Sequence, residues 1–147
     1  MIRERLGDIF SVQQQAVAHG VNLKGVMGSG IAKTVRERYP EVDEAYRKAA
    51  KSGELEAGGC LPVVSHDGTL ILNLATQIKT GSNASLELIE KSLPLMYDFL
   101  EENGYTEVAL PQIGSGIGGL NWGRVRNLII TEAQKHPSIV TDLWTFA

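Results

Sequence analysis

Short apolar runs alternate along the chain with longer segments in which apolar residues recur every three to four positions. The short runs have the length and composition of buried strands, and the longer segments have the spacing of helices with one apolar face. The predicted strands are 2–6, 16–22, 60–66, 69–75, 106–113 and 138–146, and the predicted helices are 30–53, 84–103 and 122–136.

Proline, glycine and capping residues set the predicted helix boundaries. Pro40 interrupts the first helical segment, and Gly53 is suited to end it. Pro94 lies inside the second helix, where we expect a bend. Asn121 is placed to accept a hydrogen bond at the start of the last helix.

The order of these elements predicts the fold class. Strands that alternate with helices build an α/β fold with helices on both faces of one sheet. The dipeptide DG at 67–68 indicates a hairpin between two of the strands, so the sheet is mixed. We therefore predict a three-layer α/β/α sandwich with a mixed, mostly parallel sheet of about six strands, formed by residues 1–147 as a single domain.

Composition narrows the classes of protein that are compatible with the chain. Its 147 residues carry a net charge of -3, and no apolar run approaches the length of a membrane span or of a signal peptide. Cys60 is the single cysteine and the three histidines are widely spaced, so we expect no disulfide and no metal site. We expect a cytoplasmic protein, a monomer, with no membrane partner.

Two copies of the tetrapeptide GSGI are the most unusual feature of the sequence. They lie at 28–31 and 114–117, and each follows a predicted strand and leads into a helix. Glycine loses more conformational freedom on folding than any other residue, so two glycine-rich loops indicate a structural or functional requirement that offsets this cost. Because ligands of α/β sheets bind outside the carboxyl ends of the strands, we expect the two glycine loops to lie together at one site.

Two known phosphate-binding patterns fit these loops poorly. The segment 114–119 matches G-x-G-x-x-G, but no acidic residue ends the following strand, since Asp142 lies near the start of the last one. The first loop is not a P-loop, because two residues separate Gly30 from Lys33.

A third interpretation treats the two loops as one anion site. Backbone N–H groups of glycine-rich loops form anion-binding concavities, and a helix N-terminus behind each loop adds a favourable dipole. Two facing loops would hold a diphosphate from both sides. The alternative is that each GSGI is only a short connection from strand to helix.

Longer segments around these loops resemble the macrodomain, a family of ADP-ribose-binding α/β/α domains. The similar segments are GDIF after the first strand, AVAHGVNLKGVMGSGIA, RYPEV and LPQIGSGIGGLNW. The last two resemble most closely the branch that contains ADP-ribose 1''-phosphate phosphatases and glutamate-directed ADP-ribosyl hydrolases. The resemblance covers nearly the whole chain and implies ADP-ribose or a derivative as the ligand, without a further cofactor.

The resemblance also implies a role for each part of the site. Asp8 would accept a hydrogen bond from the adenine amino group, with Ile9 beside it, and Phe146 would close the adenine pocket. Asn22 would contact the distal ribose. The first glycine loop would line that ribose and a phosphate, and the second would wrap the diphosphate. The residues involved are Gly28, Ser29, Gly30 and Ile31 in the first loop, and Gly114, Ser115, Gly116, Ile117 and Gly118 in the second.

Purely structural roles remain open for several of these residues. Asp8 and Asn22 belong to residue types that are common in turns. Trp144 and Phe146 share one face of the last strand, where packing in the core is the alternative to ligand contact.

Three residues are candidates for catalysis at C1'' of the distal ribose. The hydrolase branch implies attack by a lysine of the loop 76–83, here Lys79, assisted by an acidic residue where this chain has Gly118. His19 is a candidate general acid or base, because its ordinary pKa lies near neutrality, and Asn22 or a water held by the backbone is a further candidate. The alternatives are a solvated charge for Lys79 and a hydrogen-bonded core histidine for His19.

Two functions follow from the sequence. We predict hydrolysis of a 1''-linked ADP-ribose derivative, either ADP-ribose 1''-phosphate or an ADP-ribosylated protein or nucleic acid, with phosphate as the favoured leaving group. The alternative is a non-catalytic module that reads or sequesters ADP-ribose. Nucleic acid is expected only as an ADP-ribosylated substrate, because the net charge provides no large basic surface.

Overall fold

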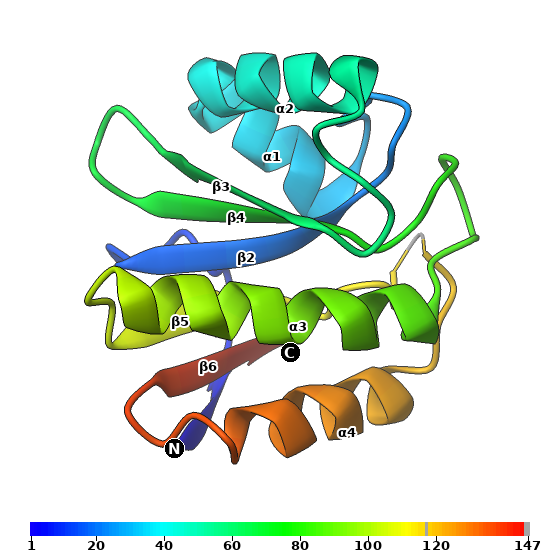
Figure 1. Cartoon of the computed structure of the whole chain (residues 1–147). Helices are drawn as coiled ribbons and strands as arrows, with labels where there is room; N and C mark the ends of the chain where they lie inside the picture. Colours follow the sequence, from blue (N-terminus) through cyan, green and yellow to red (C-terminus); the bar gives the residue numbers. More distant parts are fainter. Residues whose placement is uncertain (117, 146–147) are drawn as a thin grey trace.

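A single twisted sheet organises the chain, seen in a computed structural model that describes residues 1–116 and 118–145 (Figure 1). Within these residues the strand order is β1-β6-β5-β2-β4-β3. β3 is antiparallel to β4, and the other neighbouring strands are parallel. The strands are β1 Ile2–Leu6, β2 Ala16–Val21, β3 Cys60–Val64, β4 Leu70–Ala75, β5 Glu107–Leu110 and β6 Val140–Thr145.

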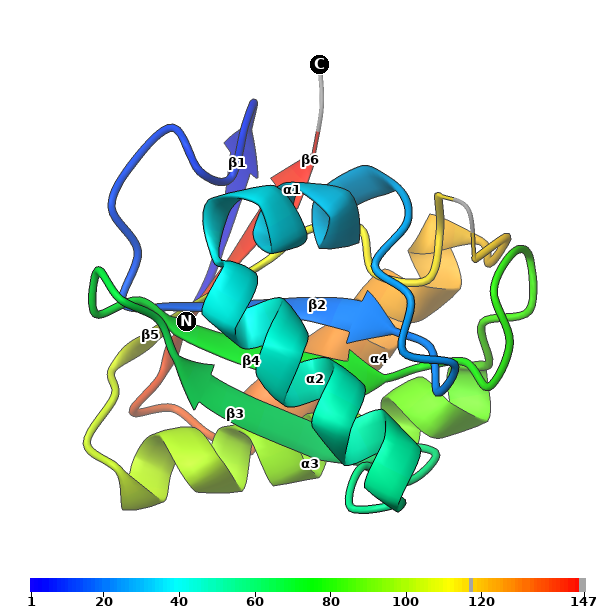
Figure 2. The ribbon, with the colours of Figure 1, turned by 90° about the horizontal axis from the view of Figure 1, so that it is seen from above.

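Four helices cover the two faces of the sheet. They are α1 Gly30–Arg38, α2 Pro40–Ser52, α3 Leu86–Glu102 and α4 Trp122–Ala133. The apolar residues of α1 and α2 pack in one buried cluster and those of α3 and α4 in another, on opposite faces (Figures 1 and 2). The predicted three-layer sandwich with a mixed six-stranded sheet is therefore confirmed for the described residues.

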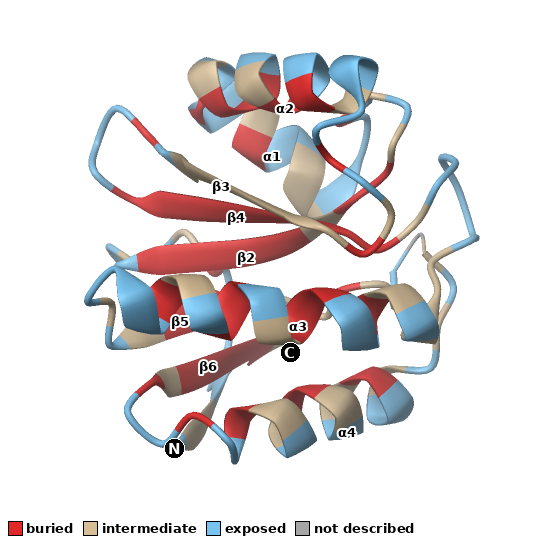
Figure 3. Ribbon diagram, viewed as in Figure 1, coloured by how far each residue is buried: buried red, intermediate tan, exposed pale blue. Residues whose placement is uncertain are grey.

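The strand β2 shows how the sequence builds both clusters. Ala16 and Ala18 belong to the cluster under α3 and α4, while Val17 and Val21 belong to the cluster under α1 and α2. This alternation follows from the two-residue period of a strand, and apolar residues on both faces suit a strand that helices cover twice. Figure 3 shows β4 buried along its length and β2 buried over most of its length.

Several predicted boundaries are confirmed. Pro40 occupies the first turn of α2, and Gly53 follows that helix in the left-handed conformation, with φ of 83°. The side chain of Asn121 accepts a hydrogen bond from the backbone N–H of Arg124 and caps α4. The helix α3 continues through Pro94.

Two elements end three residues earlier than the sequence suggested. β5 ends at Leu110 and not at 113, because Pro111 has no N–H to continue the ladder. α4 ends at Ala133 and not at 136. No helix within 1–116 and 118–145 is both long and apolar enough to cross a membrane.

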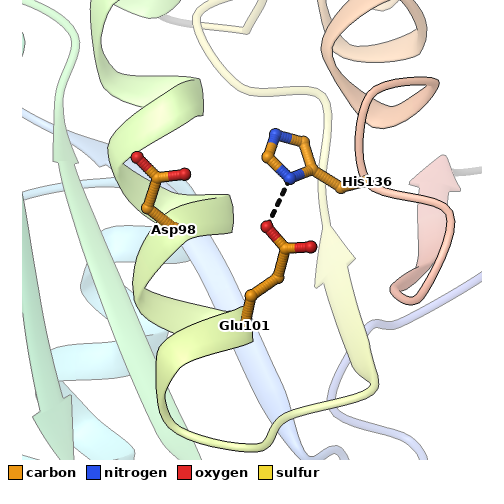
Figure 4. A group of neighbouring side chains, drawn as sticks. All are labelled: Asp98, Glu101 and His136. Atoms are coloured by element: carbon orange, nitrogen blue, oxygen red, sulfur yellow. Dashed lines mark hydrogen bonds and ion pairs between the residues drawn. The ribbon is translucent and has the colours of Figure 1, made fainter.

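His136 joins the C-terminal ends of α3 and α4 (Figure 4). Its Nδ1 lies 2.6 Å from Oε1 of Glu101, and its Nε2 lies 2.9 Å from Oε2 of Glu132. Its ring stacks on Tyr97, with the ring centroids 4.7 Å apart. Burial alone lowers the pKa of His136, but the hydrogen bonds to Glu132 and Glu101 outweigh it, and the pKa is raised.

The same contacts bear on metal binding. Ligand atoms of Asp98, Glu101 and His136 lie within 4.8 Å of one another (Figure 4). A histidine that faces a carboxylate at each ring nitrogen must donate from both, which requires the charged imidazolium. In this charged state the ring offers no lone pair to a metal, and it links the ends of the two helices through ion pairs with Glu101 and Glu132.

Replacing His136 with glutamine should lower the free energy of unfolding by about 1.5–3 kcal/mol near pH 6, a typical contribution of a hydrogen bond to a charged group. Because the pKa is raised above 6.5 in the folded state, this contribution is complete below that pH and is lost as the pH rises through the raised value. Urea unfolding of both proteins at several pH values measures the difference, which should shrink as the pH rises. A difference independent of pH would contradict a charged ring.

Candidate functional site

A cleft with a volume of about 920 Å³ opens at the carboxyl ends of the parallel strands. Its walls come from the ends of β2 and β6, from the loops after β1, β2, β4 and β5, and from the first turn of α1. This volume lies toward the upper end of the roughly 300–1,000 Å³ that is usual for ligand sites, and it suits a nucleotide-sized molecule.

Most residues predicted from the sequence line this cleft. They come from both glycine loops and from the ends of β1 and β2, and they are Asp8, His19, Asn22, Gly28, Ser29, Gly30, Ile31, Gly114, Gly116 and Gly118. Ile9, Lys79 and Ser115 are not among the lining residues. Ile117 and Phe146, which the sequence also suggested, lie outside the described residues.

The first glycine loop ends in the N-terminus of α1. Ser29 is the N-cap residue, but its side chain makes no capping hydrogen bond, and Gly30 has the positive φ of 59° that favours glycine. The first helical bond that follows runs from Lys33 N–H to the carbonyl of Ser29. The N–H groups of the first turn therefore find no acceptor among the described residues and are available to an anion in the cleft.

The second glycine loop is closed by its own backbone. The carbonyl of Gly114 accepts a 2.9 Å hydrogen bond from the N–H of Leu120, and Gly114 and Gly119 have φ of 71° and 81°. Ser115 donates its backbone N–H to Gln112, 3.2 Å away, and so uses its amide within the loop.

Gly118 is held by close packing on two sides. A Cβ atom there would lie 2.6 Å from the carbonyl oxygen of Gly114 and 2.7 Å from Cβ of Ala84. The carbonyl of Gly118 also accepts a hydrogen bond from the N–H of Ala84 at 3.2 Å. The loop in this conformation has no room for the acidic side chain that the hydrolase branch suggested at this position.

Asp8 and Trp144 lie at the end of the cleft beside β1. Oδ1 of Asp8 accepts a 2.8 Å hydrogen bond from the N–H of Phe10, so Asp8 shapes its own turn while it lines the cleft. Trp144 also lines the cleft and is 8% exposed. Ile9 is 2% exposed and packs in the core under α1 and α2.

His19 is a neutral, buried member of the site. Its Nε2 lies 2.7 Å from Oδ1 of Asn73, whose Nδ2 donates to the carbonyl of Leu61. Because that Oδ1 can only accept, the proton of the neutral ring lies on Nε2, and Nδ1 has no hydrogen-bond partner within the described residues. Burial, opposed by the hydrogen bond to Asn73, lowers the pKa of His19 to about 4. A ring in this state has no proton to donate from Nδ1 near neutral pH.

Asn22 organises the start of the loop that follows β2. Its Oδ1 accepts from the N–H of Lys24 at 2.9 Å, and its Nδ2 donates to the carbonyl of Val26 at 2.9 Å. These bonds fix the amide so that one N–H of Nδ2 remains for the cleft. An amide side chain is not a base at neutral pH, so Asn22 contributes here as a hydrogen-bond donor.

The loop after β4 presents Gln77 to the cleft and Lys79 to solvent. Nε2 of Gln77 donates to the carbonyls of Lys79 at 2.6 Å and Gly81 at 3.0 Å, which closes the loop on itself. Lys79 is exposed. Thr76 and Gln77 also line the cleft, although they are not among the residues predicted from the sequence. Their position directly after a strand could have identified them, because ligands of such sheets bind at the ends of strands.

The cleft contains almost no formal charge. Among its described lining residues only Asp8 and His19 carry titratable side chains, and none is a lysine or an arginine. An anion bound there must therefore be held by backbone N–H groups, neutral side chains and the dipole of α1.

These features define a class of site: a glycine-lined cleft of nucleotide size at the carboxyl edge of an α/β/α sandwich, with no lysine or arginine among its described lining residues. The Macro domain family model matches residues 18–129, and the chain belongs to this family. The resemblance found in the sequence is thereby confirmed.

Two curated relatives cover most of the chain. The DNA ADP-ribosyl glycohydrolase of Mycobacterium tuberculosis is 34% identical over 142 residues, which are 95% of this chain and 40% of that protein. The ADP-ribose glycohydrolase OARD1 of Homo sapiens is 31% identical over 124 residues, which are 84% of this chain and 78% of that protein. The chain thus spans well under half of the first relative.

Two solved structures have the same fold. The macrodomain of Mycobacterium tuberculosis DarG has a TM-score of 0.92 at 33% identity, and the match covers 98% of this chain and 97% of that one. Thermosipho africanus DarTG in complex with ADP-ribose has a TM-score of 0.85 at 27% identity, and the match covers 95% of this chain and 40% of that one.

Replacing Gly118 with alanine should destabilise the protein by about 1–3 kcal/mol, because the new methyl group overpacks against Gly114 and Ala84. Gly116→Ala is the matched control in the same loop, since a Cβ at Gly116 meets nothing within 4 Å. We expect the control to stay within about 0.5 kcal/mol of the wild type. Equal unfolding midpoints in urea for the two variants would contradict the close packing.

His19 should remain a neutral Nε2–H ring through the physiological pH range. Nitrogen chemical shifts of the imidazoles, followed by NMR, should show no protonation of His19 until the pH approaches about 4. His136, with its raised pKa, is the contrast in the same spectra. Because the unfolded chain protonates first, the His19 contribution to stability should fall as the pH drops from 6.5 toward 4. A His19 transition near neutral pH would restore it as a candidate general acid.

Proposed function

We propose that this chain binds ADP-ribose in the cleft and hydrolyses a bond to C1'' of its distal ribose. The observation that carries the proposal is the convergence of two glycine loops and the N-terminus of α1 on one neutral cleft of nucleotide size. Membership of the Macro domain family supports it, as do relatives named ADP-ribosyl glycohydrolases and a related structure in complex with ADP-ribose.

The proposed orientation follows the order of the strands. Adenine lies at the end beside β1, where Asp8 accepts from its amino group. The diphosphate lies between the second glycine loop and the N-terminus of α1. The distal ribose lies beside Asn22, near the loop after β4. In this orientation an acceptor faces the adenine amino group, and backbone N–H groups face the negatively charged diphosphate. Neutral polar side chains face the hydroxyl groups of the distal ribose.

The proposed reaction is attack of water at C1'', with departure of the group linked there. The distal end of the cleft offers the neutral donors and acceptors of Asn22, Thr76 and Gln77, which suit the positioning of a water molecule. ADP-ribosylated DNA is the first substrate to consider, given the name of the mycobacterial relative. ADP-ribosylated protein is a second candidate. ADP-ribose 1''-phosphate, with phosphate as the leaving group, is a further candidate.

A specific observation also favours the second function, a module that binds ADP-ribose without catalysis. The distal end of the cleft contains no titratable side chain among its described residues apart from the neutral His19. Rapid hydrolysis at C1'' benefits from an acid, a base or a nucleophile, so a weak or absent reaction is compatible with strong binding.

The two functions separate in one set of incubations. The chain is mixed with an ADP-ribosylated DNA oligonucleotide, an ADP-ribosylated protein and ADP-ribose 1''-phosphate, and free ADP-ribose is followed by chromatography. We expect release of ADP-ribose from at least one substrate, and thermal stabilisation of the chain by ADP-ribose. Binding without turnover of all three would leave the reader function, and no stabilisation by ADP-ribose would overturn both.

The variant Lys79→Ala adds a test of mechanism to the same incubations. If water attacks directly, this exposed side chain contributes little and turnover persists. If Lys79 swings into the cleft and forms a covalent intermediate, turnover is abolished while ADP-ribose binding remains. The second result would support the lysine mechanism suggested by the sequence and contradict direct attack by water.

A further inference from the structure

Tyr46 links the interior of α2 to the loop that follows β2. The residue is fully buried, at 0% exposure, and it does not line the cleft. Its hydroxyl lies 2.7 Å from the backbone carbonyl oxygen of Asn22 and 2.8 Å from Oδ1 of the same residue. One phenol thus contacts both acceptors of the residue that begins the loop.

Asn22 in turn determines the path of the next four residues. Besides Tyr46, its Oδ1 accepts from Lys24 and, at 3.4 Å, from the N–H of Val26, while its Nδ2 donates to the carbonyl of Val26. This segment has no ladder or helix bonds of its own, and Gly25 within it has φ of 74°. Its shape therefore depends on the amide of Asn22 together with the hydrogen bond from the N–H of Leu23 to the carbonyl of Ile78, and the hydroxyl of Tyr46 contacts that amide.

The shape of this segment reaches the first glycine loop. A Cβ built at Gly28 would lie 3.4 Å from Cγ1 of Val26, so the two residues are in near contact. Val26, Gly28 and Asn22 all line the cleft. A displacement of Asn22 would therefore move the free N–H of its amide. It would also move Val26 and Gly28, which form the wall of the cleft before α1.

We propose that Tyr46 is a positioning residue that holds Asn22, and through it the first glycine loop, in the geometry that binds the distal ribose. The proposal rests on the proposed function, because it assigns the distal ribose to this end of the cleft. Tyr46 does not line the cleft, so it acts without contact to the ligand. Burial raises the pKa of Tyr46 to about 12, so the phenol stays protonated and remains a donor at ordinary pH.

The test compares two ligands on the variant Tyr46→Phe, which keeps the buried ring and removes only the hydroxyl. ADP-ribose and ADP share adenosine and a diphosphate, but ADP lacks the distal ribose. The loss of one hydrogen bond to a neutral group should weaken ADP-ribose binding roughly three- to tenfold. ADP binding should weaken less than ADP-ribose binding, because the adenine end of the cleft and the second glycine loop do not depend on Asn22. Isothermal titration calorimetry measures both affinities.

Tyr97→Phe is the matched control. Tyr97 is also fully buried, and its hydroxyl is 2.6 Å from Oγ1 of Thr141, on the opposite face of the sheet. Both variants should lose a similar amount of thermal stability, but only Tyr46→Phe should lose preference for ADP-ribose over ADP. Equal changes in this preference for both variants would overturn the proposal, as would an unchanged preference for Tyr46→Phe.

A double-mutant cycle tests whether Tyr46 acts through Asn22. The effect of Tyr46→Phe on ADP-ribose affinity should be smaller in an Asn22→Ala background than in the wild type, because the side-chain acceptor is already gone. Additive effects would contradict the route through the amide.

Hydrogen exchange of the ligand-free protein keeps this inference separate from the proposed function. The backbone N–H groups of Lys24 and Val26 should exchange faster in Tyr46→Phe but not in Tyr97→Phe, since Asn22 protects them. If the wild type fails to bind ADP-ribose, the proposed function fails, whatever the exchange rates show. If it binds but the exchange rates and the ligand preference are unchanged in Tyr46→Phe, the positioning role fails alone.

Discussion

The parallel pairing of β2 with both β4 and β5 is the constraint on which the rest of the structure depends. Val17 is opposite Ala109 in β5, and Val21 is opposite Ala75 in β4. Because parallel strands end at the same edge of a sheet, the loops after these three strands meet there, although they are far apart in sequence. Gly20 allows the closest approach, since a Cβ there would lie 2.6 Å from Oγ1 of Thr76.

Backbone hydrogen bonds between the loops then turn this edge into a walled cleft. The N–H of Leu23 donates to the carbonyl of Ile78, and the N–H of Ala84 donates to the carbonyl of Gly118. The loop after β4 is thus bonded to both neighbouring loops, on either side of the site. Close packing at Gly118 is a consequence of this arrangement, and it removes space that a catalytic acid would need.

The resulting site is stronger as a binding site than as a catalytic one. Peptide N–H groups and a helix dipole bind an anion without a lysine or an arginine, which fits a cleft whose described lining residues include neither. Catalysis needs groups that exchange protons or share electrons. His19 is held neutral by burial and by Asn73, and Lys79 lies on the outside of its loop. The proposed hydrolysis would therefore rely on a positioned water molecule.

Local pattern was sufficient for the elements of the fold and for the family. The spacing of apolar residues predicted every element, because the periods of a strand and of a helix are visible in short stretches of sequence. Pro40, Gly53 and Asn121 marked helix boundaries through their effects on the local backbone. The motifs around the two glycine loops predicted the Macro domain family. Only the tertiary structure decided the orientation of Lys79, the crowding at Gly118, the proton position on His19, and the bonds from Tyr46 to Asn22 and from His136 to two glutamates. The contacts of Gly118 with Ala84, His19 with Asn73, Tyr46 with Asn22 and His136 with Glu101 join residues that are distant in the chain, and such contacts exist only once the sheet has brought its strands and loops together.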